Sequence, residues 1–521
     1  MPIQGIIGSQ LPTVTSVEAD DYLFLIQQVL TANGTKKITV PDLLKTGGKL
    51  LIVDGTNGSD TQGTRGSMVA YATLAAARTD ASSGDTILVM PGNYTGSALF
   101  KDGVNWHFMP GTSVVGTVAD PNGSATEYGI FDDRASGAVT CRITGRAVFT
   151  YTSGSATGTP NTTIRAGIYI QNASSDVRIQ CEAIKIDSGL DPDEAAGLGI
   201  VSSIWGLRQD DGNVVLECDS IEDVTFGSTT LYGGGLCFRW GRLSGKVHRI
   251  RCNVFPIVCN QVAVPSGIAH CDLIVGSCEN YNDFGVFNVM GGTTQDFRVS
   301  LRCGQMFTEN SANPGDGLVV QGGGNIIFDC LSYTTPGAGS ACVINDGNSN
   351  NVPVVTVDIG FVQNKEYVFL LGISGGTGSG PIVIGNCNQL RSVTTATLHG
   401  GAVGVFQAST VAVISGNLWK GFTGSQAIVN FNGGNVRIKG ATIDNSSNSS
   451  ATSYCVNLNN ANGLILEDCT LIAHASNNSS IHTAAAATVK LYNNTYTNKA
   501  KAAGVTVQAG LGTLVVDAAV T

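Results

Sequence analysis

Short runs in which apolar and polar residues alternate recur along most of the chain, and most of them end in Cys or Gly. Alternation with a period of two is typical of a β-strand with one buried face. From Cys252 onward the runs follow one another at intervals of roughly 24 to 30 residues, which is the range of solenoid repeats. The runs end at Cys181, Cys218, Cys252, Cys278, Cys303, Cys330, Gly360, Cys387, Gly416, Gly440, Cys469 and Asn494.

Clusters of Gly, Asn and Ser separate these runs, with no amphipathic helical pattern between them. Such clusters are typical of turns. Strands and turns at this interval predict an all-β chain folded as a parallel β-helix, in which one coil holds two or three strands. We expect the recurring Cys to occupy an equivalent inward position in each coil, where it stacks on its neighbours as a small buried hydrophobe.

The 14 cysteines are scattered singly, without a CxxC pair. This spacing favours buried free thiols over disulfides, zinc binding or redox chemistry.

The first two intervals between runs, from Cys181 to Cys218 and from Cys218 to Cys252, are wider than the later ones. They indicate extra loops, which we assign to residues 187–200 and 208–213. Insertions on one face of a solenoid often form its binding face.

Only 13% of the 521 residues are charged, against about 25% in typical soluble domains, and 67 are glycine. So few charges favour a protein that hides part of its surface in an oligomer. The net charge of -10 argues against nucleic-acid binding, which needs clustered Lys and Arg. The N-terminal residues lack a signal-peptide pattern and no run of 18 apolar residues occurs, so we expect neither export nor membrane insertion.

Residues 49–95 contain a strand-like run, a glycine-rich loop (53–66), an Ala-rich stretch with helical spacing (68–78), a turn and a second strand-like run (86–90). This order resembles the opening module of the pectate-lyase-like, right-handed parallel β-helix superfamily. The resemblance is carried by Asp54–Gly55, Gly58–Asp60, Tyr71–Leu74, Ser82–Thr86 and Pro91–Thr95. It implies a β-helix over residues 49–498, with 49–100 as an opening segment whose short helix caps the first coil. The resemblance specifies a fold and carries no activity over.

The glycine-rich loop has two interpretations. Asp54, Asn57 and Asp60 carry oxygens that could bind calcium, but the spacing and the distal Glu of an EF-hand are absent. Gly, Asn and Asp also form turns, because they tolerate positive φ and bond their own backbone, and we favour a turn-forming loop. The six histidines show no metal-ligand spacing, so neither a metal site nor a cofactor is predicted.

Residues 1–48 form a different unit, with LPTVTSVEADDYLFL followed by KKITVPDLL. This pattern resembles the small N-terminal modules of phage virion fibres and tail proteins, and the matching residues include Leu11, Asp21, Tyr22, Lys37 and Leu43. The resemblance implies attachment of this end to a tail, baseplate or capsid protein. A small hairpin that only caps the shaft is the alternative.

Residues 499–521 are almost uncharged, and apolar residues alternate along them. Alone they would form an exposed strand edge, so we expect three copies of the chain to cover this region together.

Carboxylates gather in and beside the two assigned loops. Glycan cleavage needs two carboxylates beside the scissile bond, or a lyase-type base with a cation that stabilises charge at the acid sugar. The candidate residues are Asp193, Glu194, Asp210 and Asp211. Acidic turns on a solenoid are more often solvated, and the lyase motifs of the resembled superfamily are absent.

Aromatic residues lie in the same region. Trp205, Tyr232 and Trp240 could stack on sugar rings, although burial is the commoner fate of such residues.

These features predict a structural virion component of a bacteriophage, made in the host cytoplasm. It would be a tail fibre, tailspike or baseplate-attached spike, in which a homotrimeric β-helix binds a host-surface glycan or receptor. A polysaccharide depolymerase, either hydrolase or lyase, and a capsid decoration or head fibre are the alternatives. A free bacterial lyase is disfavoured because the export signal is missing.

Overall fold

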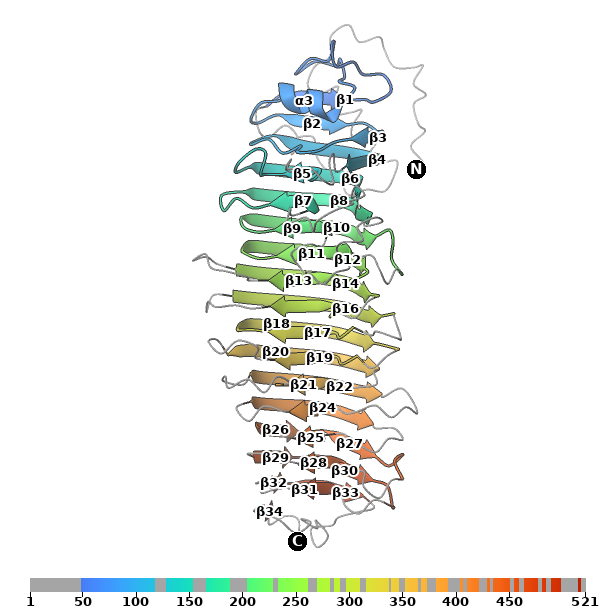
Figure 1. The fold of residues 1–521 in the computed structure, drawn as a ribbon, viewed down its shortest axis with the longest axis vertical. Coiled ribbons are helices and arrows are strands. Elements are labelled where there is room, and N and C mark those ends of the chain that lie inside the picture. The colour runs from blue at the N-terminus through green and yellow to red at the C-terminus, as the bar shows by residue number, and fades with distance from the viewer. Residues whose placement is uncertain are drawn as a thin grey trace, which may run out of the picture.

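The computed structural model shows one long stack of β-strand coils (Figure 1). Each strand of a coil pairs in parallel with the matching strand of the next coil, so the chain is a parallel β-helix, as the sequence predicts. The structure describes residues 48–117, 128–152, 165–187, 204–227, 233–260, 269–281, 285–290, 297–309, 315–336, 339–345, 352–363, 367–372, 381–391, 403–405, 410–420, 429–431, 434–449, 454–458, 463–476, 480–483, 489–497 and 514–516.

The described strands form two sheets, one of 21 strands and one of 13, here called sheet A and sheet B. Sheet A consists of β1 (Leu50–Val53), β2 (Thr86–Val89), β3 (Gly92–Thr95), β4 (Asn105–Thr117), β6 (Thr140–Thr152), β8 (Asp176–Asp187), β10 (Asn213–Asp223), β12 (Gly241–Cys252), β14 (Ala269–Asn280), β16 (Phe297–Thr308), β18 (Gly324–Thr334), β20 (Pro353–Gln363), β22 (Ile382–Arg391), β24 (Val411–Lys420), β26 (Asn435–Lys439), β27 (Thr442–Asn445), β29 (Gly463–Glu467), β30 (Thr470–Ala473), β32 (Val489–Tyr492), β33 (Thr495–Thr497) and β34 (Leu514–Val516). Sheet B consists of β5 (Phe131–Asp132), β7 (Arg165–Ile170), β9 (Ile204–Gln209), β11 (Gly233–Phe238), β13 (Ile257–Asn260), β15 (Phe287–Met290), β17 (Leu318–Gln321), β19 (Cys342–Asn345), β21 (Phe369–Leu371), β23 (Val403–Val405), β25 (Val429–Phe431), β28 (Val456–Leu458) and β31 (Ile481–Thr483).

Alternation along the strands of sheet A points every second side chain into the core. In β10, for example, Val214 and Leu216 are buried whereas Glu217 is exposed. Matching residues stack in register from coil to coil and join one continuous apolar cluster that extends from Leu51 to Leu491. Burying each such side chain contributes roughly 1.5–3 kcal/mol, so the stack gains stability from every coil.

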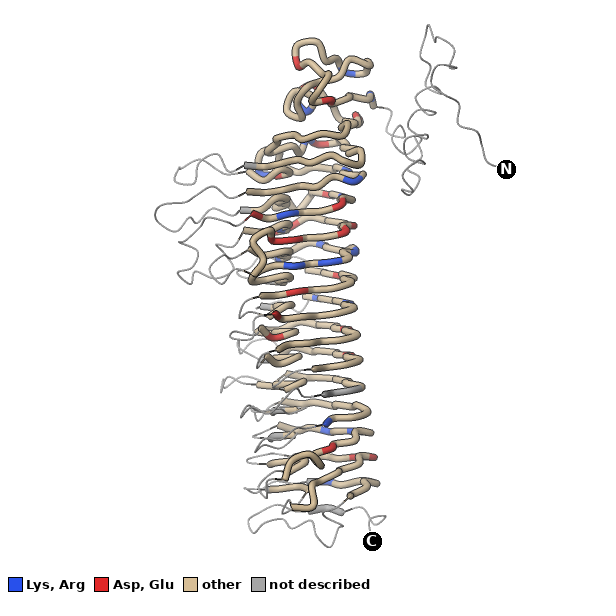
Figure 2. The backbone as a smooth tube through the Cα atoms, turned by 90° about the vertical axis from the view of Figure 1, so that its right-hand side faces the viewer, with Lys and Arg blue, Asp and Glu red and all other residues tan. Residues whose placement is uncertain are grey.

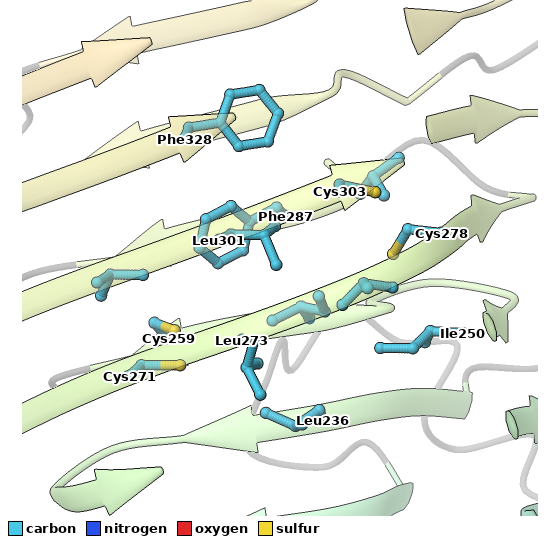
Figure 3. Packing of buried hydrophobic residues seen from close by; sticks show 14 of the residues in the cluster. Leu236, Ile250, Cys259, Cys271, Leu273, Cys278, Phe287, Leu301, Cys303 and Phe328 are labelled. Atoms are coloured by element: carbon cyan, nitrogen blue, oxygen red, sulfur yellow. The ribbon is translucent and has the colours of Figure 1, made fainter. Parts of the chain in front are cut away.

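The recurring cysteines mark a bend in sheet A. Cys218, Cys303 and Cys330 are each the last inward residue before two successive outward residues, where the strand turns. Their Sγ atoms donate to the carbonyl oxygen two residues later, at 3.0, 3.2 and 3.1 Å. Cysteine suits this position because it is small, apolar and able to make a weak S–H hydrogen bond. Figure 3 shows cysteines packed among leucine and phenylalanine side chains in the core.

The prediction of one equivalent cysteine position is wrong for Cys252 and Cys278. Val247 and Val275 occupy the position before the bend in these coils. Cys252 and Cys278 instead point inward beyond the bend, where the alternation resumes. All 14 cysteines are buried and free, which confirms the predicted thiol state.

Coil length varies near the N-terminal end of the stack. Val177 in β8 pairs with Val214 in β10, 37 residues later. Val214 pairs with Leu243 in β12, only 29 residues later, so the first of these two coils is longer. Of the first predicted loop, residues 188–200 lie outside the described residues. The second predicted loop is wrong, because residues 208–213 end β9, form a short turn and begin β10. Gln209 Nε2 donates to the carbonyl oxygen of Gly212 at 2.8 Å and holds this turn.

The opening segment has the predicted order of strand, loop, helix and strand. β1 pairs with β2, and the helix α3 (Leu74–Asp80) lies at the N-terminal end of the stack with Leu74 and Ala77 buried (Figure 1). The helix begins at Leu74 rather than at Met68 because Thr73 caps it, its Oγ1 accepting from the Ala76 N–H at 3.2 Å.

The glycine-rich loop forms turns. The Asp54 carboxylate accepts from the backbone N–H groups of Thr56 and Asn57 at 2.9 and 3.1 Å, as an Asx turn does. The Asp60 carboxylate accepts from the N–H groups of Ala72 and Thr73 at 2.8 and 2.9 Å, directly before α3. The loop carboxylates therefore hold the helix and the turn in place.

The roles predicted for the two ends of the chain stay untested. Residues 1–47, which contain the predicted attachment residues, lie outside the described residues. At the other end, β34 pairs in parallel with β32 and extends the stack by one strand. No helix among the described residues is long and apolar enough to cross a membrane.

Candidate binding surface

Asp210 lies in a cluster of charged side chains on the outer face of sheet B. Arg208 Nε donates to Asp210 Oδ1 at 2.8 Å, and the Tyr169 hydroxyl donates to Asp210 Oδ2 at 2.6 Å. Arg239 Nη1 approaches the same Oδ2 to 3.5 Å. Burial, together with the Asp210 charge, raises the pKa of the Tyr169 hydroxyl. Both oxygens of Asp210 are thus engaged by groups of the chain itself.

A second ion pair adjoins this cluster. Arg134 Nη2 lies 2.6 Å from Oδ2 of the fully buried Asp132, and the Arg134 guanidinium lies 4.6 Å from the centre of the Tyr169 ring. Arg208 approaches the same ring to 5.9 Å. Cation–π contacts of this kind tie the coils of β5, β7 and β9 together. Asp132, Arg208 and Asp210 are only 0%, 4% and 15% exposed, so the cluster serves the fold.

The structure brings only part of the predicted carboxylate set together. Asp211 follows Asp210 in the short turn, and its Oδ1 accepts from the Gly212 N–H at 2.7 Å. Asp193 and Glu194 lie outside the described residues, so the catalytic role of the four stays an untested prediction.

Two of the predicted aromatic contact residues are buried. Trp205 is fully buried and stacks on Phe255 with ring centres 6.3 Å apart. A Cβ on Gly234 would lie 2.5 Å from the Trp205 ring, so this glycine allows the indole to fit. Trp240 belongs to the main core. Tyr232 lies outside the described residues.

A different surface collects partly exposed charged and aromatic side chains beyond the bend of sheet A, at the ends of β10, β12, β14 and β16. We call it the Arg251 facet, and it consists of Phe226, Arg249, Arg251, Glu279, Tyr281 and Glu309. Arg249 makes a bidentate pair with Glu279, in which Nε donates to Oε1 at 3.0 Å and Nη2 donates to Oε2 at 2.9 Å. This bond raises the pKa of the Arg249 guanidinium.

Arg251 is the centre of the facet. Its Nε lies 3.1 Å from Glu279 Oε2, but the N–H does not point at that oxygen, so the contact is an ion pair without a hydrogen bond. Its Nη2 lies 3.6 Å from Glu309 Oε1. The guanidinium stacks over the Phe226 ring at 3.9 Å, and Phe226 meets Tyr281 edge to face at 5.6 Å. Both rings are half-buried, unlike the tryptophans of the core.

A signal for this facet exists in the sequence but is weak. Glu222, Arg251, Glu279 and Phe307 are register partners on successive strands, so the charges alternate in sign from coil to coil. A whole coil separates each of them from the next in the sequence, and only the register reveals that they are neighbours. Figure 2 shows bands of acidic and basic residues on the coils of the N-terminal half, while the coils further on are mostly uncharged.

The facet has the chemistry to hold a hydroxyl-rich or charged ligand. Aromatic rings offer flat apolar contact, and forked guanidinium and carboxylate groups offer hydrogen bonds in fixed directions. Comparisons of this chain with family models, with curated proteins and with solved structures found no match.

Proposed function

We propose that this protein is a structural component of a bacteriophage particle, a fibre or spike whose β-helix shaft binds a glycan on the host surface. Residues 1–48 would attach it to a tail, baseplate or capsid protein, and the assembled form would be a homotrimer. The pattern of residues 11–44 supports attachment, and the low charge supports assembly.

The observation that carries the proposal is the Arg251 facet on a rigid stack. Arg249, Arg251 and Glu279 project from the paired strands β12 and β14, and the geometry of the facet is fixed by mutual ion pairs and ring contacts. A preorganised surface loses less entropy when it binds a ligand.

Binding is favoured over glycan cleavage by the contacts of Asp210. A general acid or nucleophile must reach the scissile bond, whereas both Asp210 oxygens already accept bonds from Arg208 and Tyr169.

The test uses the full chain and a panel of purified bacterial capsules and lipopolysaccharides. We expect at least one of them to bind, and we expect Phe226→Ala combined with Arg251→Ala to raise its Kd by about tenfold or more. Arg146→Ala is the matched control, since Arg146 is an exposed, ion-paired arginine outside the facet.

Equal affinity of the facet variant and the wild type would refute the facet as the binding surface. Release of new reducing ends or unsaturated sugars that is lost in Asp210→Ala or Asp193→Ala would establish the depolymerase instead. Gold labelling of the N-terminus on phage particles distinguishes a tail from a head position.

A further inference from the structure

Six aliphatic side chains on four successive strands of sheet A point outward into solvent. They form the apolar strip, which consists of Ile327, Val354, Ile382, Ile384, Val411 and Val413. Each is between 36% and 54% exposed, whereas the inward residues of the same strands are almost fully buried.

Register makes the strip continuous. On one line, Val354 pairs with Ile382, and Ile382 with Val411. On the line two residues further along the strands, Thr356 pairs with Ile384, and Ile384 with Val413. Neighbouring strands lie about 4.8 Å apart, so the side chains make a straight ridge along the stack. Ile327 extends the second line by pairing with Thr356.

The size of the strip points to a covered surface. Its six side chains expose roughly 400 Å², and apolar patches of that size on monomeric proteins are often functional. Most other outward positions of sheet A carry polar or charged residues, which are the ordinary means of keeping a sheet soluble.

Charged ladders border the strip on both sides along the stack. Towards the N-terminus, Arg302 pairs with Asp329 at 3.8 Å. Towards the C-terminus, Arg437 and Lys439 both pair with Glu467. Each ladder is largely neutralised within one chain, and the uncharged strip lies between them.

We propose that a second copy of this chain packs against the apolar strip, parallel to the first and with equal coils at equal height. This inference deepens the proposed fibre, on which it rests, by naming the surface through which its copies associate. The strip supplies the dry centre of the interface, and the bordering ladders supply its polar rim.

The charged ladders are compatible with the parallel arrangement, because each contains both signs of charge. A parallel copy brings each ladder beside its own equivalent, where arginine can meet the acid of the neighbouring chain. A cyclic assembly about an axis along the stack keeps this match at every coil.

Ile384→Lys tests the strip, because the position is outward and a lysine there would meet its equivalents at the same height. We expect the oligomer of the wild type to dissociate at least tenfold more readily in light scattering, while far-ultraviolet circular dichroism and the melting temperature show an intact fold. Val224→Lys is the matched control, as Val224 is 52% exposed and lies outside the strip.

A second variant tests the same contact by cross-linking the copies and not by weakening the assembly. Thr356→Cys adds an exposed thiol to a chain whose 14 cysteines are all buried, and it lies between Ile327 and Ile384. We expect mild oxidation to join copies through residue 356, and not through the exposed control Gln305→Cys. If the Ile384→Lys variant stays oligomeric and residue 356 forms no cross-link, the strip is not the interface between copies. That result would not contradict the proposed fibre. A monomeric wild type would overturn both.

Discussion

At the scale of single residues, the inward cysteines explain both a success and a failure of sequence reasoning. Alternation predicted that they are buried, and burial is confirmed for all of them. The prediction that all of the recurring cysteines stack in one position is wrong, because sheet A has an inward position on each side of the bend. Val247 and Cys252 both satisfy the alternation, and only strand pairing shows which of them occupies the position of Cys218.

The thiols should be inert in the folded protein. Burial raises the pKa of Cys237 and of Cys455 to about 12, so almost no thiolate forms at neutral pH. We expect no reaction with a thiol reagent on the minute timescale, and reaction of all 14 cysteines after denaturation. Rapid native labelling of even one cysteine would contradict the burial described above.

His107 should make folding sensitive to acid. Its ring is buried, Nδ1 lies 3.0 Å from Thr144 Oγ1, and burial lowers its pKa from 6.5 to about 4. Between those values the unfolded chain takes up a proton that the folded chain excludes. Stability from this group is therefore complete above pH 6.5 and falls by about 3 kcal/mol as the pH drops to 4.

Calorimetry can check this prediction through melting temperatures. We expect the wild type to lose more stability than His107→Gln between pH 7 and pH 4.5, whereas His248→Gln, whose side chain is 60% exposed, should follow the wild type. An identical pH profile for wild type and His107→Gln would contradict the account.

At the scale of elements, periodicity was enough for the strands and not for their connections. The runs around Cys218 and Cys303 became β10 and β16, because alternation at period two reports burial directly. The wide Cys218–Cys252 interval predicts an insertion at 208–213, but Cys218 pairs with Val247, so the interval joins two different inward positions and overstates the length of the coil. Apolar spacing predicts that the helix starts at residue 68, whereas Asp60 and Thr73 fix the start of α3 through hydrogen bonds.

Turns between the sheets should depend on particular glycines. Gly241 has φ +82, and a Cβ there would lie 1.9 Å from the carbonyl oxygen of Gly212 in the previous coil. Gly137 has a similar φ of +74 with nothing within 4 Å of its added Cβ. We expect Gly137→Ala to cost about 1 kcal/mol from backbone strain alone, and Gly241→Ala to cost more because of the clash. Equal melting temperatures for the two variants would show that the coils do not pack this closely.

At the scale of the whole molecule, the two proposed functional surfaces consist of residues that are distant in sequence. Neither the Arg251 facet nor the apolar strip could be predicted, because each is assembled from residues of successive coils and depends on the register between them. The predicted tryptophan Trp205 was buried instead, since a second apolar cluster forms on the outer face of sheet B. The low charge of 13% predicts surface hidden in an oligomer; the exposed apolar strip is compatible with that prediction, which stays untested.

The mass of the purified full-length protein in solution, measured by light scattering across a dilution series, tests the central claim most directly. One chain has a mass of 53.8 kDa, and a fibre of three parallel β-helices predicts about 161 kDa that persists at micromolar concentration. A stable species at the mass of a single chain would contradict a shaft built from several copies.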